Sequence, residues 1–423
     1  MTGFLCPAMA EETPDIYVLA TNGSAVLAEE TGSVLVWPGQ YASIEPLGQS
    51  GLYAARRLSG GGLGVIRADG SALTAFAYSA LDYDGSAIVF SENGRCGAMN
   101  LAGEVVIEPL YTRLVSMDDG WLALKTSSLD DTPDALWRVN ADGTEHHTGI
   151  HLSFGPLAAS EGLAEAADTL GRWGWLNGEG AWAIEPQFVW CGPFRDGLAC
   201  AASETGTGLV DRAGDWVIEP LYDRLARGPA NRPLLAFQEG AVSLIAQDGT
   251  AVARFEGEGA DAAYTDGLIS VALEGRRFLV DSQGSVVYEA PAGVAALDER
   301  GGCIIEQRGF SELKPFRFHG TDGALHESWQ ELSFAGLYEG RAYLIFSEYS
   351  TAETAYEAQG FVFHDEVIGT RRYGILNDEG DVIAGGFTSL KRTGRALLTA
   401  ETESWIGLIR PNGTVIMSLE KAE

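Results

Sequence analysis

Potential metal-binding side chains gather at one place in the sequence. Glu145, His146, His147 and His151 lie within seven residues, and on a β-strand His147 and His151 would share a face because successive residues alternate between faces. Zinc is held by three protein ligands in catalytic sites and by four in structural sites. No third ligand is evident, so we interpret these histidines as exposed and predict no metal site.

Catalytic signatures are missing elsewhere. The sequence has no HExxH, no GxSxG and no phosphate loop ending in Gly-Lys-Ser/Thr. Gly257, Gly259 and Ala262 imitate a dinucleotide fingerprint, but no helix or βαβ pattern follows them. Adjacent carboxylates such as Asp118-Asp119 and Asp365-Glu366 are expected by chance in so acidic a chain. We therefore predict no catalytic residues, no cofactor and no enzymatic activity.

Tryptophans form the densest group of potential binding residues. Trp175, Trp182, Trp190 and Trp216 lie close together in the sequence. Packing between structural units accounts for most such residues. Rigid aromatic rings are also good interface anchors for a sugar ring or for a partner's apolar side chain. These four tryptophans are our candidate binding residues.

The composition restricts the kind of partner. The chain has 423 residues, 59 of them acidic and 28 basic, and a formal charge of −31. The resulting field repels phosphate backbones, which excludes nucleic acid as a partner. No run of 18 apolar residues is present, so we predict no transmembrane helix. The cysteines are scattered and odd in number, so we expect no disulfide framework, and most of them should be buried thiols: Cys6, Cys96, Cys191, Cys200 and Cys303.

The first residues indicate where the protein is found. Residues 3–11 end in small residues spaced as in the tail of a secretory signal, without its basic and long apolar parts. We interpret residues 1–15 as disordered or processed. This favours the cell envelope or the extracellular space over the cytoplasm, although a frayed cytosolic terminus would look the same.

The elements that carry these residues repeat along the chain. Turn glycines recur at spacings of 31 to 57 residues, most of them near 35, at Gly39, Gly70, Gly103, Gly143, Gly180, Gly214, Gly249, Gly284, Gly323, Gly380 and Gly413. Such a period is typical of propellers, solenoids and arrays. Asp-Gly or Asn-Gly pairs at five of these positions, Gly70, Gly143, Gly249, Gly323 and Gly413, predict hairpins. Residues 16–423 are therefore predicted to be an array of about eleven units.

Each unit is predicted to hold four short strands. The runs that flank the turns are rich in β-branched and aromatic residues, and helical periodicity is absent. Pro109, Pro186 and Pro220 are expected to end the pairing of the strand after the turn. Residues 16–20 form a spare strand, which we expect to complete the last unit and close a ring.

The units resemble the WG repeats of bacterial proteins. Residues 173–177, 183–188 and 194–199 match the family's Trp-Gly pair, its Val-Ile-x-Pro-x-Tyr stretch and its Phe-x-Asp-Gly-Leu-Ala stretch nearly position by position. The resemblance covers most of the chain and is strong from about residue 94 to residue 253. It implies a scaffold and little about its activity.

The sequence thus predicts an all-β protein of tandem four-stranded antiparallel units, arranged as β-propeller-like blades. An open β-solenoid or superhelix of blades and two tandem rings are the alternatives. The favoured function is a non-catalytic scaffold that binds a protein or glycan, with an insertion near residues 341–370 as its recognition loop. A carbohydrate-active hydrolase or lyase on a propeller, and a purely structural spacer, are the alternatives.

Overall fold

The computed structural model contains β-strands as its only regular element in the part of the chain that it describes. That part comprises residues 16–21, 24–29, 31–126, 134–157, 159–229, 231–308, 316–329, 331–358, 361–393 and 397–421. The prediction for residues 1–15 lies outside it. Nothing in these residues forms a helix of the length and hydrophobicity that crossing a membrane requires.

The strands form nine antiparallel sheets, in each of which the strands follow chain order. Seven sheets have four strands, while a five-stranded and a seven-stranded sheet each join two neighbouring units through a shared strand, β3 or β13. The described residues therefore contain eleven units, which we number as blades 1 to 11 in chain order.

The strands of blades 1 to 5 are β1 (Ile16–Thr21), β2 (Ser24–Glu29), β3 (Val34–Pro46), β4 (Leu52–Arg57), β5 (Leu63–Arg67), β6 (Ala80–Tyr83), β7 (Ile88–Glu92), β8 (Arg95–Met99), β9 (Val105–Tyr111), β10 (Arg113–Met117), β11 (Gly120–Lys125), β12 (Asp134–Asn140), β13 (Glu145–Phe154), β14 (Ala164–Asp168), β15 (Trp173–Leu176) and β16 (Trp182–Phe188). Those of blades 6 to 8 are β17 (Trp190–Cys191), β18 (Leu198–Ala202), β19 (Thr207–Asp211), β20 (Trp216–Tyr222), β21 (Arg224–Ala226), β22 (Leu234–Gln238), β23 (Ala241–Ile245), β24 (Ala251–Glu256), β25 (Asp261–Tyr264), β26 (Ile269–Leu273), β27 (Arg276–Val280) and β28 (Val286–Glu289). Those of blades 9 to 11 are β29 (Val294–Arg300), β30 (Cys303–Arg308), β31 (Phe316–His319), β32 (Leu325–Trp329), β33 (Glu331–Tyr338), β34 (Arg341–Ala358), β35 (Phe361–Asn377), β36 (Val382–Phe387), β37 (Ser389–Arg392), β38 (Leu398–Glu401), β39 (Trp405–Ile409) and β40 (Val415–Glu420).

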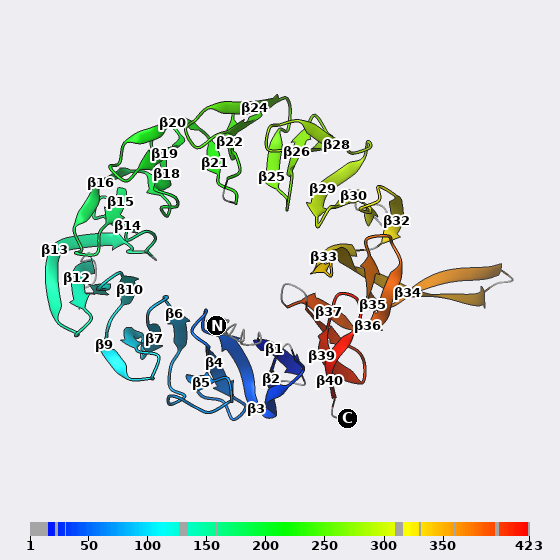
Figure 1. Ribbon diagram of the computed structural model, residues 1–423, viewed down its shortest axis with the longest axis horizontal. Coiled ribbons are helices and arrows are strands. Elements are labelled where there is room, and N and C mark those ends of the chain that lie inside the picture. The colour runs from blue at the N-terminus through cyan, green and yellow to red at the C-terminus, as the bar shows by residue number, and fades with distance from the viewer. Residues whose placement is uncertain are drawn as a thin grey trace, which may run out of the picture.

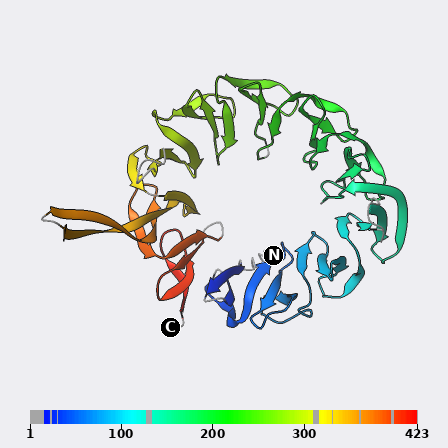
Figure 2. The same ribbon diagram turned by 180° about the vertical axis from the view of Figure 1, so that it is seen from behind.

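The blades follow one another around a single ring (Figure 1), and the view from behind shows the same arrangement (Figure 2). The first strand of a blade, such as β21 or β25, lies toward the middle of the ring, and the fourth strand, such as β24, lies on the outside (Figure 1). Blades 1 and 11 meet through a buried cluster in which Val26 and Ala28 pack against Leu408 and Met417. The propeller-like arrangement is thus a closed ring rather than an open superhelix or two tandem rings.

The predicted role of the spare strand is wrong. Residues 16–21 form β1, which pairs with β2 of the same blade. Blade 11 takes all four of its strands, β37 to β40, from the last part of the chain. The prediction places the boundary between units at the wrong strand, because a repeat of four strands can be divided at any strand boundary. The ring closes by side-chain packing between complete sheets.

The hairpin turns have the predicted positions with one exception. Ten of the predicted glycines, Gly70 to Gly413, close tight turns with positive φ, as Gly103 does at 84°. In blade 1 the turn glycine is Gly32, whose amide N–H donates to the carbonyl of Glu29. Gly39 lies within β3. Only the glycine takes a positive φ. The residue before it keeps an ordinary backbone, and Asp69, for example, accepts a bond from the amide of Ser71 at 2.9 Å.

The geometry that recurs in three units of this chain explains the Trp-Gly pair and the proline. On β15 and β16, Trp173 pairs with Phe188 and Trp175 pairs with Ile184. Between these two pairs the outer strand β16 advances by four residues while β15 advances by two, so β16 contains a β-bulge. Pro186 lies in this bulge, where an absent N–H breaks no ladder bond. The prediction that proline ends the strand is therefore wrong. The same shift surrounds the other two prolines, on β9 and β20.

The bulge brings a backbone carbonyl against the glycine of the Trp-Gly pair. A Cβ atom at Gly174 would lie 2.5 Å from the oxygen of Ile184 and 3.0 Å from the nitrogen of Pro186. The equivalent distances to the carbonyl oxygen are 2.6 Å at Gly97 and 2.2 Å at Gly208. Glycine is required here for space, since none of the three has a positive φ.

Candidate functional site

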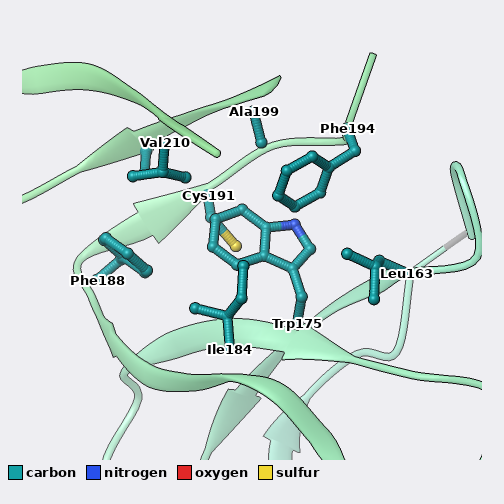
Figure 3. Packing of buried hydrophobic residues seen from close by; sticks show 9 residues of the cluster. Leu163, Trp175, Ile184, Phe188, Cys191, Phe194, Ala199 and Val210 are labelled. Atoms are coloured by element: carbon teal, nitrogen blue, oxygen red, sulfur yellow. The ribbon is translucent and has the colours of Figure 1, made fainter. Parts of the chain in front are cut away.

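The most strongly repeated part of the ring buries its central tryptophan. Trp175 is fully buried, and its indole Nε1 donates to the carbonyl of Gly192 at 3.2 Å. Its ring centroid lies 5.4 Å from that of Phe188 and 5.1 Å from that of Phe194, with both rings edge-on. Figure 3 shows how aliphatic side chains and Cys191 enclose the rest of the indole. Trp175 therefore joins blades 5 and 6 and presents no surface to a ligand.

The other three candidate tryptophans lie in different surroundings. Trp216 is partly buried against the cluster around Trp175. Trp182 is partly buried against a second cluster, which contains Leu122 and Leu176. Trp190 is 47% exposed. The four tryptophans thus divide between two hydrophobic clusters and one exposed position, because the alternation of strand residues separates neighbours in the sequence.

The predicted shared face of the histidines is confirmed. The rings of His147 and His151 lie 5.9 Å apart, and the ring of His147 meets that of Trp137 edge-on at 4.9 Å. No group of three or more His, Cys, Asp or Glu residues is placed to hold a metal ion in the part of the chain that the structure describes.

The insertion predicted near residues 341–370 is a long β-hairpin. β34 and β35 pair from Tyr343 opposite Asn377 to Ala358 opposite Phe361. Beyond the ladders with β33 and β36, residues 349–370 pair only with each other among the described strands. We call this part the hairpin extension. It projects outward from the ring, away from the other blades (Figures 1 and 2).

Register separates two classes of residue on the hairpin extension. Residues directly opposite each other in an antiparallel pair belong to one face, and alternate pairs share it. One face combines the pairs Ala352–Val367, Thr354–Asp365, Tyr356–Phe363 and Ala358–Phe361. The other combines Thr351–Ile368, Glu353–Glu366, Ala355–His364 and Glu357–Val362. The first face is therefore mainly apolar, whereas the second carries three glutamates, and we call them the apolar face and the acidic face.

Arg371 holds the base of the hairpin extension. Its guanidinium pairs with Glu331 of β33 and donates to the hydroxyl of Ser347 through Nε at 3.1 Å and Nη2 at 3.0 Å. Ser347 is fully buried. These contacts tie β33, β34 and β35 together at the point where the extension leaves the blade.

Two connected cavities adjoin this base. One of about 580 Å³ is lined by residues of blades 9 to 11, including Ser347 and Tyr373, and one of about 390 Å³ continues it toward β29. They share Gln307, Phe316, Leu332 and Ser333. We call the pair the blade 9–11 groove. No pattern in the sequence predicts this groove, because its residues come from three units and are neither alike nor regularly spaced.

A comparison with known protein families recognises the repeat in the middle of the chain. The family model for the WG containing repeat matches residues 173–202 and 208–231, where the Trp-Gly pair and the bulge are described above. No curated protein sequence matches the chain. The fold defines the class: the protein is an all-β, propeller-like array of four-stranded units, and within it residues 173–231 are similar to the WG containing repeat.

Solved structures are similar only distantly. A eukaryotic initiation factor matches at 10% identity, 89% of this chain, 97% of its own and a TM-score of 0.38. The Pan2 WD40 domain of Neurospora crassa matches at 12% identity, covering 54% of this chain and 77% of its own, with a TM-score of 0.26. Hsv2 of Kluyvelomyces marxianus matches at 9% identity, covering 56% of this chain and 88% of its own, with a TM-score of 0.28. Such low TM-scores support no inference about this chain.

Proposed function

We propose that the protein is a non-catalytic scaffold at the bacterial cell envelope that holds a partner protein, with the hairpin extension as its recognition arm. The observation that carries this proposal is the extension itself, in which residues 349–370 leave the blade and place mainly apolar residues on one face. Insertions in repeat arrays are common sites of recognition.

The physical argument starts from the instability of an isolated ribbon. A two-stranded hairpin without a third strand or a packed face is only marginally stable in water. Here the pair Glu353–Glu366 adds like charges directly opposite each other, which destabilises a strand pair. A partner that covers the apolar face and brings lysine or arginine beside the glutamates removes both costs.

The blade 9–11 groove supplies a second contact region. It adjoins the base of the hairpin extension through Ser347 and Tyr373, and it contains apolar residues such as Phe316, Leu332 and Phe346 beside polar ones. A partner bound to the extension can therefore reach the groove without crossing another blade. Apolar pockets with polar rims are typical of interfaces with affinity and specificity.

A protein partner is favoured over the glycan alternative by the position of the aromatic residues. Trp175 is enclosed, and Trp182 and Trp216 are partly enclosed, so they do not form one continuous aromatic platform. The apolar face of the hairpin extension is instead a surface that another polypeptide can cover.

The test compares two substitutions on opposite faces of one ladder. Phe363→Ser changes the apolar face, and Val362→Ser, one residue away, changes the acidic face and serves as the matched control. A photo-crosslinking amino acid at position 363 identifies the partner, which is then purified and titrated against each variant. Loss of an apolar anchor weakens binding at least about tenfold, and replacing residues 350–368 by an Asn-Gly turn abolishes it.

The outcome is clear in either direction. Unchanged affinity after replacement of residues 350–368 removes the proposal. Equal effects of the two serine variants would also contradict it. Binding of a purified oligosaccharide that survives this replacement would favour the glycan alternative, and turnover of that oligosaccharide would favour the carbohydrate-active one.

A further inference from the structure

Three arginines line one cavity on the opposite part of the ring. The cavity has a volume of about 390 Å³ and lies between the loops that join the first and second strands of blades 5, 6 and 7. Arg195 comes from the β17–β18 loop, and Arg227 and Arg232 come from the β21–β22 loop. In a chain with a formal charge of −31, so many cations in one cavity are unexpected.

Two of these arginines are fixed by neighbouring blades. Arg227 donates to the carbonyl of Leu198 at 2.7 Å and to that of Arg195 at 3.0 Å, both in blade 6. Arg232 donates to the carbonyl of Thr265 at 2.8 Å, on the loop that follows β25 in blade 8. Since neutral carbonyls accept these bonds, both guanidinium groups are held in place while keeping their charge.

The acidic residues of the cavity already face cations. Glu161 lies 3.4 Å from Arg212 and accepts a bond from the amide of Gly197 at 3.1 Å. Asp196 lies 3.8 Å from Arg227 and is 70% exposed. Each carboxylate is thus balanced by one arginine.

Arg195 and Arg232 are left without a carboxylate partner. Arg195 is exposed, and its guanidinium makes no ion pair or hydrogen bond with any residue that the structure describes. Arg232 donates hydrogen bonds to carbonyl oxygens alone within the same residues, and its guanidinium lies 5.3 Å from the centroid of the neutral Tyr264 ring. The cavity consequently has an excess of positive charge, with one guanidinium held rigid and the other free to close on a ligand.

The geometry points to a binding site for a small oxyanion, a carboxylate or phosphate group, between Arg195 and Arg232. A guanidinium presents paired N–H groups whose geometry matches the oxygen atoms of a carboxylate and those of a phosphate. Polyanions are excluded by the field of the whole chain, so the ligand is a small molecule. This site lies in blades 5 to 7 and is independent of the hairpin extension.

The experiment titrates the full-length protein by calorimetry with succinate and with inorganic phosphate, at constant ionic strength and with chloride as the reference anion. Arg195→Gln removes the unpartnered charge without removing any bond that supports the fold. Arg95→Gln is the matched control, because Arg95 is also exposed and lies on β8. Asp196→Asn removes a negative charge from the cavity.

The site predicts saturable binding of one or both anions, and the tighter anion identifies the ligand chemistry. Loss of a charge-assisted contact weakens that binding on the order of tenfold in Arg195→Gln, whereas Arg95→Gln leaves it unchanged and Asp196→Asn strengthens it. The inference is overturned if neither anion binds saturably at millimolar concentration. It is also overturned if the two arginine variants behave alike.

Discussion

Replacing the glycine of the Trp-Gly pair by alanine tests the account of the repeat unit. In Gly174→Ala the new methyl group would lie 2.5 Å from the oxygen of Ile184 and 3.0 Å from the nitrogen of Pro186. Both are backbone atoms of the bulge, so no flexible side chain can move aside. Overpacking of this kind costs about 1–3 kcal/mol. We expect Gly174→Ala to unfold at a lower urea midpoint than the wild type. The fluorescence of the adjacent Trp173 and Trp175 reports the transition.

A second glycine on a strand gives the control. A Cβ atom at Gly385 on β36 meets nothing within 4 Å, and Gly385 has no positive φ. Gly385→Ala should therefore change the free energy of unfolding by no more than about 0.5 kcal/mol, with a small gain from the stiffer unfolded chain. In Gly208→Ala the new methyl group would lie 2.2 Å from the oxygen of Ile218, so this variant should lose stability as Gly174→Ala does. Equal midpoints for Gly174→Ala and Gly385→Ala would refute the steric explanation.

Two further predictions concern buried groups. Burial raises the pKa of the Glu165 carboxyl, which is 2% exposed and has one oxygen, Oε1, without a hydrogen-bond partner among the described residues. Ionisation of Glu165 therefore opposes folding. The stability that the neutral carboxyl allows is fully present below the pKa that Glu165 has in the unfolded chain, and it is lost as pH rises through the pKa that Glu165 has in the folded protein. Glu165→Gln should be more stable than the wild type by on the order of 1 kcal/mol at neutral pH, and urea midpoints should converge at about pH 4; a constant difference across pH would contradict this. Burial also raises the pKa of the Cys303 thiol to about 11, so iodoacetamide should modify Cys303 only after denaturation, and peptide mass spectrometry showing alkylation as fast as at the partly exposed Cys96 would disprove it.

The local features of the unit could be predicted from the sequence, because they depend on residues near one another. The hairpin at Gly70 follows from its Asp-Gly turn, and the strands follow from their β-branched and aromatic residues. The shared face of His147 and His151 follows from alternation alone. The errors involve position within the unit: the sequence predicts a turn at Gly39, whereas Gly32 makes the turn, since both glycines are followed by strand-forming residues.

Features that depend on contacts between units could not be predicted. The partner of residues 16–21 depends on which strand is nearest in the ring, and no local pattern records this. Burial of Trp175 depends on Phe194 from the following blade. The cavity around Arg195 and Arg232 combines residues from non-equivalent positions of different repeats, so a comparison of repeats hides it.

The shared strands β3 and β13 give the ring an uneven stiffness. Blades 1 and 2, and likewise blades 4 and 5, are joined by backbone ladders that continue from one blade into the next. Other neighbouring blades share no strand in the described chain and meet largely through side chains, which can slide at small cost, whereas directional backbone hydrogen bonds resist bending. When the ring is deformed, as by a partner pulling on the hairpin extension, it should bend at the joints without a shared strand, and the two double blades should move as rigid segments.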